Sequence, residues 1–477
     1  RVQVNPLDCT GCGNCADVCP TKEKALVMKP AQGESQEQNP NWEFSLTLSA
    51  KDNLMDRSTL KGSQFAQPLL EYNGACPGCG ETPYVRLITQ LFGERMMIAN
   101  ATGCSSIWSA SAPSIAYTVN AEGKGPAWAN SLFEDNAEYG YGMFLGVRHI
   151  RERLADLMQQ LLAQGTAVQA SQGTVVQAGQ GTAVQAGQGP LQEVSQDTPQ
   201  AVSQSVPVEV AKAFRQWLEV MDDGEASKAA SKSVIKALTD IDRKSNPLLE
   251  EIFEKKDFLV KKSFWILGGD GWAYDIGYGG LDHVLASGDD VNLFVMDTEI
   301  YSNTGGQSSK ATPTAAVAKF AASGKKMRKK DLGMMAMSYG YVYVAQIAMG
   351  ANMNQTIKAI TEAESYKGPS LIIAYAPCIS HGIKSGMGTS IAEEKKAVDA
   401  GYWHLYRFNP ELREAGKNPF LLESKEPTEP FQDFLKGEIR YTQLMNTFPE
   451  QADQLFTEAE KYARERYETY RQLAEQK

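Results

Sequence analysis

Four cysteines near the amino end carry the most specific chemical pattern in the chain. They follow the spacing Cys9-x2-Cys12-x2-Cys15-x3-Cys19 and are followed directly by proline. This is the spacing of bacterial ferredoxins, in which three thiolates hold one [4Fe–4S] cluster and the fourth cysteine reaches a second cluster. Thiolates match iron–sulfur because both are soft, whereas structural zinc prefers two separated pairs. The spacing therefore predicts iron–sulfur binding, with structural zinc as the alternative.

The chain has one such run, although a two-cluster ferredoxin has two. The partner run normally comes first, and only eight residues precede Cys9. Either a second chain supplies the missing ligands, or this chain is the carboxyl-terminal part of a longer protein. We expect the second arrangement.

The other four cysteines are spread along the chain as Cys76, Cys79, Cys104 and Cys378. The first two alone also fit a zinc half-site or a redox pair, and a lone cysteine is most often a buried apolar thiol. However, Cys104 and Cys378 each follow a predicted strand, and open α/β sheets bind ligands beyond the carboxyl ends of their strands. We therefore consider that four thiolates meet there around another [4Fe–4S] cluster.

A glycine-rich segment, Gly268–Gly271, lies between a predicted strand and a predicted helix, where its amides can meet an anion. Within it, Asp270 is placed to bind a hard cation that bridges a diphosphate. After the next strand, the Thr298 hydroxyl and the Ile300 carbonyl add two oxygen ligands suited to Mg²⁺. The arrangement resembles the thiamine diphosphate fingerprint, except that Thr298 stands where an asparagine pair is usual.

The elements that must position these residues form an α/β pattern. Buried strands are predicted at 96–99, 263–267, 291–296, 341–349 and 370–375, and helices near Thr82, Tyr274, Asp331 and Asn352. Strand–helix alternation implies a doubly wound, mainly parallel sheet covered on both faces. The last stretch, 449–477, is predicted to be one amphipathic helix.

A chain of 477 residues is too long for one core. We expect a partial ferredoxin-like domain with a polar, irregular linker over 1–70, an α/β cofactor domain over 71–400, and a helical extension over 401–477. A low-complexity insertion at 164–208 interrupts the second domain, and Gln-Gly-Thr recurs in it every eight residues. A flexible insertion is favoured over a short β-solenoid.

Composition excludes several classes of protein. The net charge of −10 argues against a nucleic-acid binder, and no uncharged apolar run is long enough to span a membrane. The first residues have no apolar secretory core. Because an oxidising compartment would convert these thiols to disulfides, we expect a cytoplasmic, oxygen-sensitive protein suited to anaerobic conditions.

Five segments together resemble the pyruvate:ferredoxin (flavodoxin) oxidoreductase family. They are CPGCGETPY at 76–84, ATGCSS at 101–106, GDGWAYDIGYGG at 269–280, DTEIYSNTGGQ at 297–307 and APC at 376–378. The resemblance extends over nearly the whole chain except the Gln-rich insertion. It implies a sheet of the thiamine diphosphate-binding type. It also implies oxidative decarboxylation of pyruvate, transfer of the acetyl unit to coenzyme A, and electron exit through three [4Fe–4S] clusters to ferredoxin or flavodoxin.

The resemblance also assigns residues. The inner cluster, nearest the thiamine, would be held by Cys76, Cys79, Cys104 and Cys378. The outermost cluster would be held by Cys9, Cys12 and Cys15. The middle cluster would receive Cys19 as a ligand. Mg²⁺ would be bound by Asp270, Thr298 and the Ile300 carbonyl. Thiamine diphosphate would be contacted by Glu81, Cys104, Gly269, Asp270, Gly271, Trp272, Thr298, Glu299, Ile300, Tyr301, Ser302 and Asn303. Of these, Asn303 would also lie near pyruvate and is the candidate catalytic residue.

Three parts of the family's machinery lie in its amino-terminal part. They are the carboxylate that activates the aminopyrimidine of the cofactor, the main pyruvate-binding residues and the coenzyme A domain. We therefore expect this chain alone to bind cofactors without turning over pyruvate, and the enzyme to be a dimer. The alternatives are an oxidoreductase for another 2-oxoacid, a non-enzymatic electron-transfer module and a zinc-binding structural protein. A basic run at 325–330 is expected to be solvated, or otherwise to dock an acidic electron carrier, and His381 is expected to have a packing role.

Overall fold

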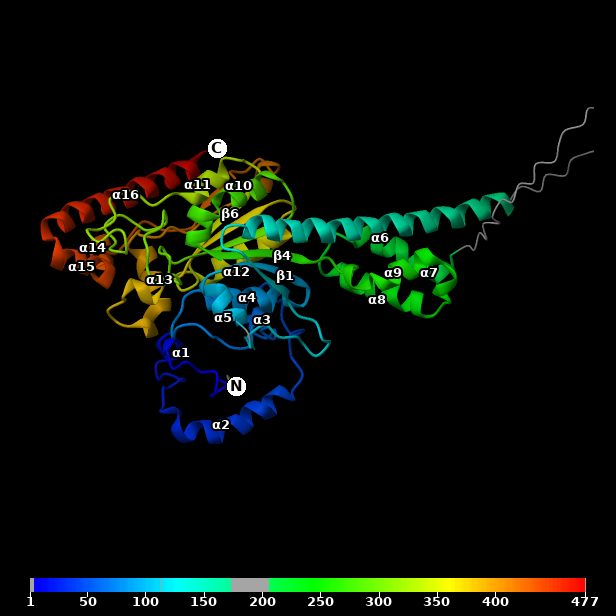
Figure 1. The fold of residues 1–477 in the computed structure, drawn as a ribbon, viewed down its shortest axis with the longest axis horizontal. Helices are drawn as coiled ribbons and strands as arrows, with labels where there is room; N and C mark the ends of the chain where they lie inside the picture. Colours follow the sequence, from blue (N-terminus) through cyan, green and yellow to red (C-terminus); the bar gives the residue numbers. More distant parts are fainter. Residues whose placement is uncertain (1–3, 112, 173–205, 477) are drawn as a thin grey trace, which may run out of the picture. The chain divides into compact units, whose positions relative to one another are not determined.

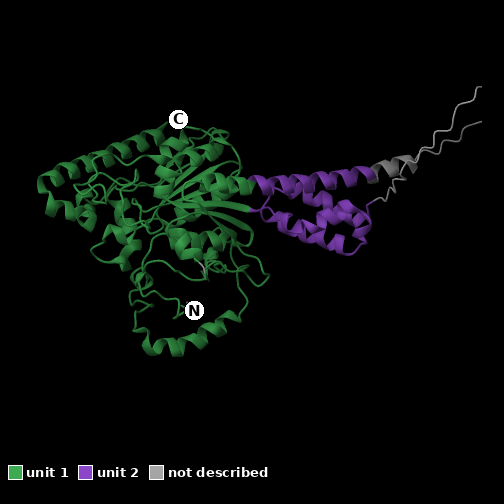
Figure 2. Cartoon of the chain, viewed as in Figure 1, with its two compact units in different colours: residues 1–144, 263–477 green, residues 145–262 purple. Residues whose placement is uncertain are grey.

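The computed structural model describes residues 4–111, 113–172 and 206–476, which form two compact units (Figure 2). Unit 1 comprises Arg1–Phe144 and Ser263–Lys477, and unit 2 comprises Leu145–Lys262. Unit 1 contains every cysteine and the whole sheet. The functional residues predicted above therefore all lie in unit 1.

An eight-stranded sheet in the order β3-β1-β4-β5-β7-β6-β8-β9 forms the centre of unit 1. Its strands are β1 (Met96–Ala101), β3 (Ala127–Ser131), β4 (Ser263–Gly269), β5 (Asn292–Asp297), β6 (Tyr343–Ile347), β7 (Ser370–Tyr375), β8 (Tyr406–Phe408) and β9 (Phe420–Leu422). The first six in spatial order pair in parallel, and β8 and β9 extend the edge in antiparallel fashion. A two-residue strand, β2 (Ser114–Ile115), lies outside this sheet. The five predicted strands and the mainly parallel sheet are confirmed.

Alternating side chains of the buried strands contact helices on opposite faces of the sheet. On β4, Trp265 packs near Phe92 of α4 (Thr82–Phe92), with ring centroids 5.9 Å apart. The preceding residue, Phe264, packs against Phe144 of α6 (Asn136–Gln172), with ring centroids 5.3 Å apart. Because successive strand residues point to opposite faces, these contacts show that helices cover both faces (Figure 1). The sheet is doubly wound, as predicted.

Three of the remaining helices of the α/β part lie where helices were predicted, namely α10 (Tyr278–Ala286), α11 (Leu332–Met337) and α12 (Met353–Ser365). Three others were not predicted, namely α3 (Leu60–Ser63), α5 (Cys104–Ala110) and α13 (Ser390–Asp399). The side chains of Asp331 and Asn352 accept hydrogen bonds from the first turns of α11 and α12, which explains where these helices begin.

The predicted helical extension over 401–477 is helical from Phe431 on, with α14 (Phe431–Lys436), α15 (Ile439–Thr447) and α16 (Pro449–Glu475), whereas its first part contributes β8 and β9 to the sheet. On α16, Leu455 and Phe456 are buried, and Tyr470 packs against Tyr406 of β8 at 4.9 Å. The long terminal helix therefore covers the antiparallel edge of the sheet.

The amino-terminal segment differs from the prediction of an irregular linker. After the short helix α1 (Asn14–Asp17), residues Ala31–Leu46 form the helix α2. Its interior contains Pro40, which argued against a helix because proline lacks an amide hydrogen. The neighbouring glutamine and glutamate residues favour a helix, and no residue of α2 is buried.

Unit 2 is a helical unit that the sequence patterns did not reveal. The helix α6 continues into it and packs with α7 (Val208–Val220), α8 (Ala226–Thr239) and α9 (Pro247–Glu254). The core includes Leu157 and Trp217, and the Trp217 indole donates a hydrogen bond to the Leu259 carbonyl at 2.8 Å. Most of the predicted insertion, residues 173–205, lies outside the described residues. Among the described helices, none combines the length and apolar character that crossing a bilayer requires.

Candidate functional site

Cys76, Cys79, Cys104 and Cys378 line one cavity of about 170 Å³. The first two lie before α4, Cys104 begins α5 after β1, and Cys378 follows β7. Because β1 and β7 run parallel in one sheet, their carboxyl ends lie at the same edge. The structure thus brings together the four sulfurs that the sequence analysis placed around one site.

Two glycines allow the cysteine segments to approach each other. Gly78 has a φ of +78°, a left-handed conformation that suits glycine. The Gly80 amide donates a hydrogen bond to the Pro377 carbonyl at 3.0 Å. A Cβ atom on Gly80 would lie 2.5 Å from the Pro377 nitrogen, so only glycine fits without displacing the backbone.

The chemistry of this cavity fits an iron–sulfur cluster. Four thiols line one cavity, and thiolates are the usual ligands of such a cluster. The amides of Glu81 and Ser380 donate to the sulfurs of Cys79 and Cys378, each at 3.4 Å. Burial raises the pKa of the Cys104 and Cys378 thiols, so metal binding would have to displace protons.

A second cavity of about 270 Å³ adjoins the first and contains the glycine-rich segment. The lining residues include Gly269, Asp270, Gly271, Ile300 and Tyr301. The two cavities share five lining residues, namely Glu81, Cys104, Thr298, Ser302 and Asn303. Any molecule bound in the second cavity would therefore contact side chains that also border the cysteine cavity.

Three predicted oxygen ligands meet beside the second cavity. The Thr298 hydroxyl lies 2.9 Å from Asp270 Oδ1 and 3.0 Å from the Ile300 carbonyl oxygen. Adjacent ligands of an octahedral Mg²⁺ ion, at about 2.1 Å from the metal, are about 3 Å apart. The spacing of these oxygens therefore fits a small divalent cation. Burial raises the pKa of Asp270, as does the neighbouring Asp297 carboxylate.

The glycines of the segment are required by close packing. A Cβ atom on Gly271 would lie 2.5 Å from the Tyr301 ring, and one on Gly268 would lie 2.4 Å from the Trp272 ring. The segment leads into one π-helical turn, Gly271–Ile276, before α10 begins. The predicted helix after Asp270 is thus present, but its first turn is wider than an α-helical turn.

Glu81, another predicted cofactor contact, is buried on the wall between the cavities. Its Oε2 accepts a hydrogen bond from the Trp108 indole at 2.7 Å. Burial raises the pKa of the Glu81 carboxyl to about 7, and the hydrogen bond from Trp108 opposes this effect. Near neutral pH this carboxyl can therefore accept or donate a proton.

Two predicted cofactor contacts do not line the second cavity. Trp272 is fully buried and packs against Gly268 and Gly277. The Glu299 carboxylate is also buried and pairs with Lys329 and Arg440, each at 2.9 Å. Both residues follow a cavity-lining neighbour in the sequence, and motif position alone does not show which way a side chain points.

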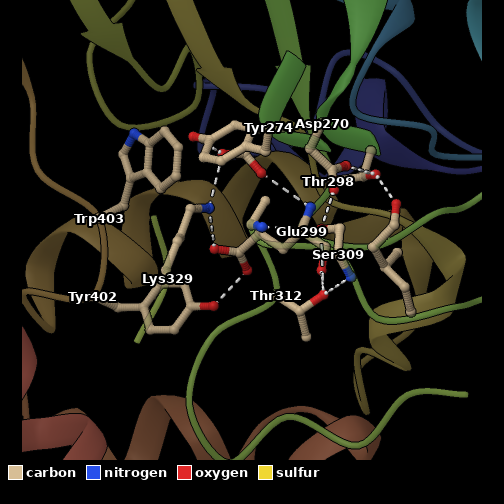
Figure 3. Close-up of polar contacts among 12 residues, drawn as sticks. Asp270, Tyr274, Thr298, Glu299, Ser309, Thr312, Lys329, Tyr402 and Trp403 are labelled. Atoms are coloured by element: carbon tan, nitrogen blue, oxygen red, sulfur yellow. Dashed lines mark hydrogen bonds and ion pairs between the residues drawn. The ribbon is translucent and has the colours of Figure 1, made fainter. Parts of the chain in front are cut away.

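Several polar residues of the site were missed or misjudged from the sequence. The Ser309 hydroxyl donates to Asp270 Oδ2 at 2.7 Å, and the Thr312 hydroxyl donates to the Glu299 carbonyl at 2.7 Å (Figure 3). The expectation that the basic run is solvated is wrong for Lys329, whose side chain is 7% exposed. His381 is buried, and its Nε2 donates to the Thr298 carbonyl at 2.7 Å, so it supports the loop as well as packing.

The amino-terminal cysteine run lies against the segment that carries the inner cysteines. Asn14, between Cys12 and Cys15, donates to the Ser390 hydroxyl at 2.9 Å. Ser390 in turn donates to the Gly78 carbonyl at 2.7 Å. A short hydrogen-bonded path therefore joins the two groups of cysteines.

Cys19, the fourth residue of that run, is the one buried thiol among its cysteines in the described structure. Its sulfur accepts a hydrogen bond from the Ala25 amide at 3.3 Å and contacts the Thr21 hydroxyl at 3.3 Å. The Thr21 hydroxyl and neighbouring amides lower the pKa of Cys19 to about 6. A thiolate, the form that binds iron, is thus favoured at this position.

Two family models match parts of the chain. A family model described as the thiamine pyrophosphate enzyme C-terminal TPP binding domain matches residues 257–374, and a 4Fe-4S binding domain model matches residues 2–22. The first match contains Asp270, Thr298 and Ile300, and the second contains the four cysteines of the amino-terminal run.

Relatives match along nearly the whole chain. It is 54% identical over 474 residues to pyruvate-flavodoxin oxidoreductase from Klebsiella pneumoniae and 55% identical over 484 residues to pyruvate:ferredoxin oxidoreductase from Moorella thermoacetica. The alignments cover 99% and 100% of this chain but 37% of each relative. One solved structure that matches is a 2-oxoglutarate:ferredoxin oxidoreductase from Magnetococcus marinus, with 21% sequence identity over 33% of this chain and 46% of that chain. Its TM-score of 0.23 is too low to inform the fold.

Proposed function

We propose that this chain carries the thiamine diphosphate site and the electron exit of a pyruvate:ferredoxin or pyruvate-flavodoxin oxidoreductase. The chain is similar to such enzymes over nearly its whole length. The reaction would be oxidative decarboxylation of pyruvate, with the acetyl unit passed to coenzyme A. Electrons would leave through [4Fe–4S] clusters to ferredoxin or flavodoxin.

The observation that carries this proposal is the wall shared by the two cavities. Cys104 and Asn303 border both the cysteine cavity and the cavity that contains Asp270. A redox centre in one cavity would therefore lie beside an organic cofactor in the other. An oxidative decarboxylase needs this adjacency, because the electron pair left by carbon dioxide must move to an acceptor.

The oxygens around Asp270 are proposed to hold Mg²⁺ and, through it, a diphosphate. Asp270 and Thr298 supply side-chain oxygens, and Ile300 supplies its carbonyl. Thiamine diphosphate bound there would supply a carbanion that adds to a 2-oxoacid and an electron sink for its decarboxylation. Gly269 and Gly271 leave room along the wall because they have no side chains.

Asn303 is the proposed catalytic residue because its amide borders both cavities and can hydrogen-bond a 2-oxoacid there. Glu81, on the same shared wall, is also proposed to contact the cofactor. Its carboxyl, whose pKa is raised to about 7 by burial, can hold or release a proton at neutral pH.

Electrons are proposed to pass from the inner cysteines to the amino-terminal run, where Cys9, Cys12 and Cys15 hold the outermost cluster and Cys19 serves the middle one. The contact of Asn14 with Ser390, and of Ser390 with Gly78, supports this route. We further propose a cytoplasmic, dimeric enzyme that works under anaerobic conditions.

The test is anaerobic purification of this chain and of the full-length native protein, followed by measurement of iron, sulfide, magnesium and thiamine diphosphate and of pyruvate-dependent reduction of a low-potential carrier. Both proteins should bind the cofactors, and only the full-length protein is expected to reduce the carrier with pyruvate. Intact clusters without thiamine diphosphate binding would instead support an electron-transfer module, and zinc in place of iron would overturn the proposal. Preference for 2-oxoglutarate or a branched oxoacid would reassign the substrate.

A further inference from the structure

A buried lysine joins two carboxylates that lie on either side of Thr298. The Nζ atom of Lys329 is 2.9 Å from Glu299 Oε1 (Figure 3). The same atom is 2.8 Å from Asp297 Oδ2. The rings of Trp403 and Tyr274 lie 4.9 and 5.6 Å from the same nitrogen. A buried ammonium is costly unless it is paired, and here it neutralises two carboxylates that would otherwise repel each other.

The residue that Lys329 holds has an unusual backbone. Glu299 has a φ of +60°, a left-handed conformation that is rare and unfavourable for a residue with a side chain. Such a conformation persists only where surrounding contacts enforce it. The strain therefore points to the contacts around Glu299 as the element that shapes this loop.

Glu299 is fixed at each of its polar groups. Its amide donates to Asp297 Oδ1 at 3.0 Å, and its carbonyl accepts from the Thr312 hydroxyl at 2.7 Å. Its carboxylate pairs with Lys329 and with Arg440, and also accepts from the Tyr402 hydroxyl. The lining of the second cavity includes none of these partners, so they hold Glu299 without bordering that cavity.

The backbone of Glu299 sets the geometry of its two neighbours. Thr298 and Ile300 directly precede and follow it, and their oxygens lie 3.0 Å apart. A change of φ at the intervening residue would move the Ile300 carbonyl relative to the Thr298 hydroxyl. The fit of these oxygens to one small cation therefore depends on the contacts that hold Glu299.

We propose that Lys329 is a positioning residue, whose ammonium joins Asp297 and Glu299 and so keeps the loop at 297–300 in the conformation that binds a divalent cation with a diphosphate. Lys329 touches neither cavity that the proposed cofactors would occupy. The inference rests on the proposed function, because the ligand is the Mg²⁺–thiamine diphosphate assigned there.

The experiment compares Lys329→Met with Lys329→Arg in the full-length native protein. The readout is the dissociation constant of thiamine diphosphate as a function of Mg²⁺ concentration, measured by calorimetry without pyruvate. We expect Lys329→Met to weaken binding about tenfold or more, since about 1.4 kcal/mol of lost preorganisation corresponds to a factor of ten. Lys329→Arg should restore part of the affinity. Lys326→Met, an exposed lysine of the same basic run, is the matched control and should bind like the wild type.

Cluster content and circular dichroism are measured on the same samples to show that the fold is intact. If Lys329→Met does not fold, Glu299→Gln is used instead, because it keeps the size of the side chain and weakens both ion pairs; a several-fold loss of Mg²⁺-dependent binding is then expected. Wild-type affinity in the folded Lys329→Met protein, or in Glu299→Gln if that variant is needed, would overturn the proposed role of Lys329. Failure of the wild type to bind thiamine diphosphate with Mg²⁺ would instead overturn the proposed function.

Discussion

The Gly80 amide bonds to the Pro377 carbonyl, and this contact places the Cys79 segment directly against the Cys378 segment. Replacing Gly80 with alanine would put a methyl group 2.5 Å from the Pro377 nitrogen. We expect Gly80→Ala to separate the two segments and to lose most of the inner cluster, measured as iron and sulfide per chain.

The control for this change is Gly142→Ala. A Cβ atom on Gly142 meets nothing within 4 Å, and the residue is exposed on α6. Alanine there should leave iron content unchanged and slightly favour the helix. An unchanged iron content in Gly80→Ala would show that the two segments tolerate a wider separation.

Removing Cys104 tests whether the two groups of cysteines hold separate clusters. Cys104→Ala should lose about four iron atoms per chain, because one [4Fe–4S] cluster loses a ligand from the inner cavity. The electron paramagnetic resonance signal of the amino-terminal cluster should remain. Cys12→Ala should show the reverse pattern, and loss of all iron from either variant would contradict independent sites.

Ser309 is expected to tune the proposed Mg²⁺ site because its hydroxyl donates to Asp270 Oδ2 at 2.7 Å. Ser309→Ala removes this hydrogen bond, so Asp270 loses a partner that orients it, and Mg²⁺ affinity should fall several-fold. Titration of thiamine diphosphate binding with Mg²⁺ measures the effect. Ser308→Ala is the control, because Ser308 contacts Lys325 rather than Asp270; equal effects in both variants would argue for general loosening of the loop.

Glu394 should make the stability of unit 1 depend on pH. It accepts hydrogen bonds from the Tyr84 hydroxyl at 3.0 Å and the Gly350 amide at 2.8 Å, and burial raises the pKa of its carboxyl from 4.5 to about 8. The folded state then keeps a proton that the unfolded state releases above pH 4.5, so stability falls as pH rises from 4.5 to 8. The loss is roughly 4 kcal/mol at pH 8.

Urea unfolding at several pH values checks this prediction. Glu394→Gln should flatten the profile, and the difference from the wild type should grow between pH 5 and 8. Glu458→Gln, on the exposed part of α16, is the control. A Glu394→Gln profile parallel to that of the wild type would show that this carboxyl does not control the pH dependence.

The sequence was sufficient to predict the five central strands and the shared edge at which Cys104 and Cys378 lie, because both follow from local patterns, whereas β3, β8 and β9 were not predicted. Short apolar runs identified β1, β4, β5, β6 and β7, and parallel pairing required their carboxyl ends to share one edge. Once Cys104 and Cys378 were placed after β1 and β7, topology put both at one edge of the sheet, but β4 and β5 lie between those strands, and only the structure shows that both cysteines line one cavity.

Side-chain direction and long-range pairing were not predictable in the same way. Lys329 lies in a basic run that looks solvated, yet its partner Glu299 is thirty residues away in sequence and is buried beside it. Trp272 follows the glycine-rich segment but turns into the core. The core of unit 2 joins segments on both sides of the Gln-rich insertion, and no local motif links them.

The two groups of cysteines differ in how much of the fold each one needs. The amino-terminal cysteines fall within one short stretch, so their spacing is set locally along the chain. The inner cavity exists only after β1 and β7 have taken their places in a finished sheet. Damage to β1 or β7 would therefore abolish the inner site while leaving the spacing of the amino-terminal cysteines unchanged.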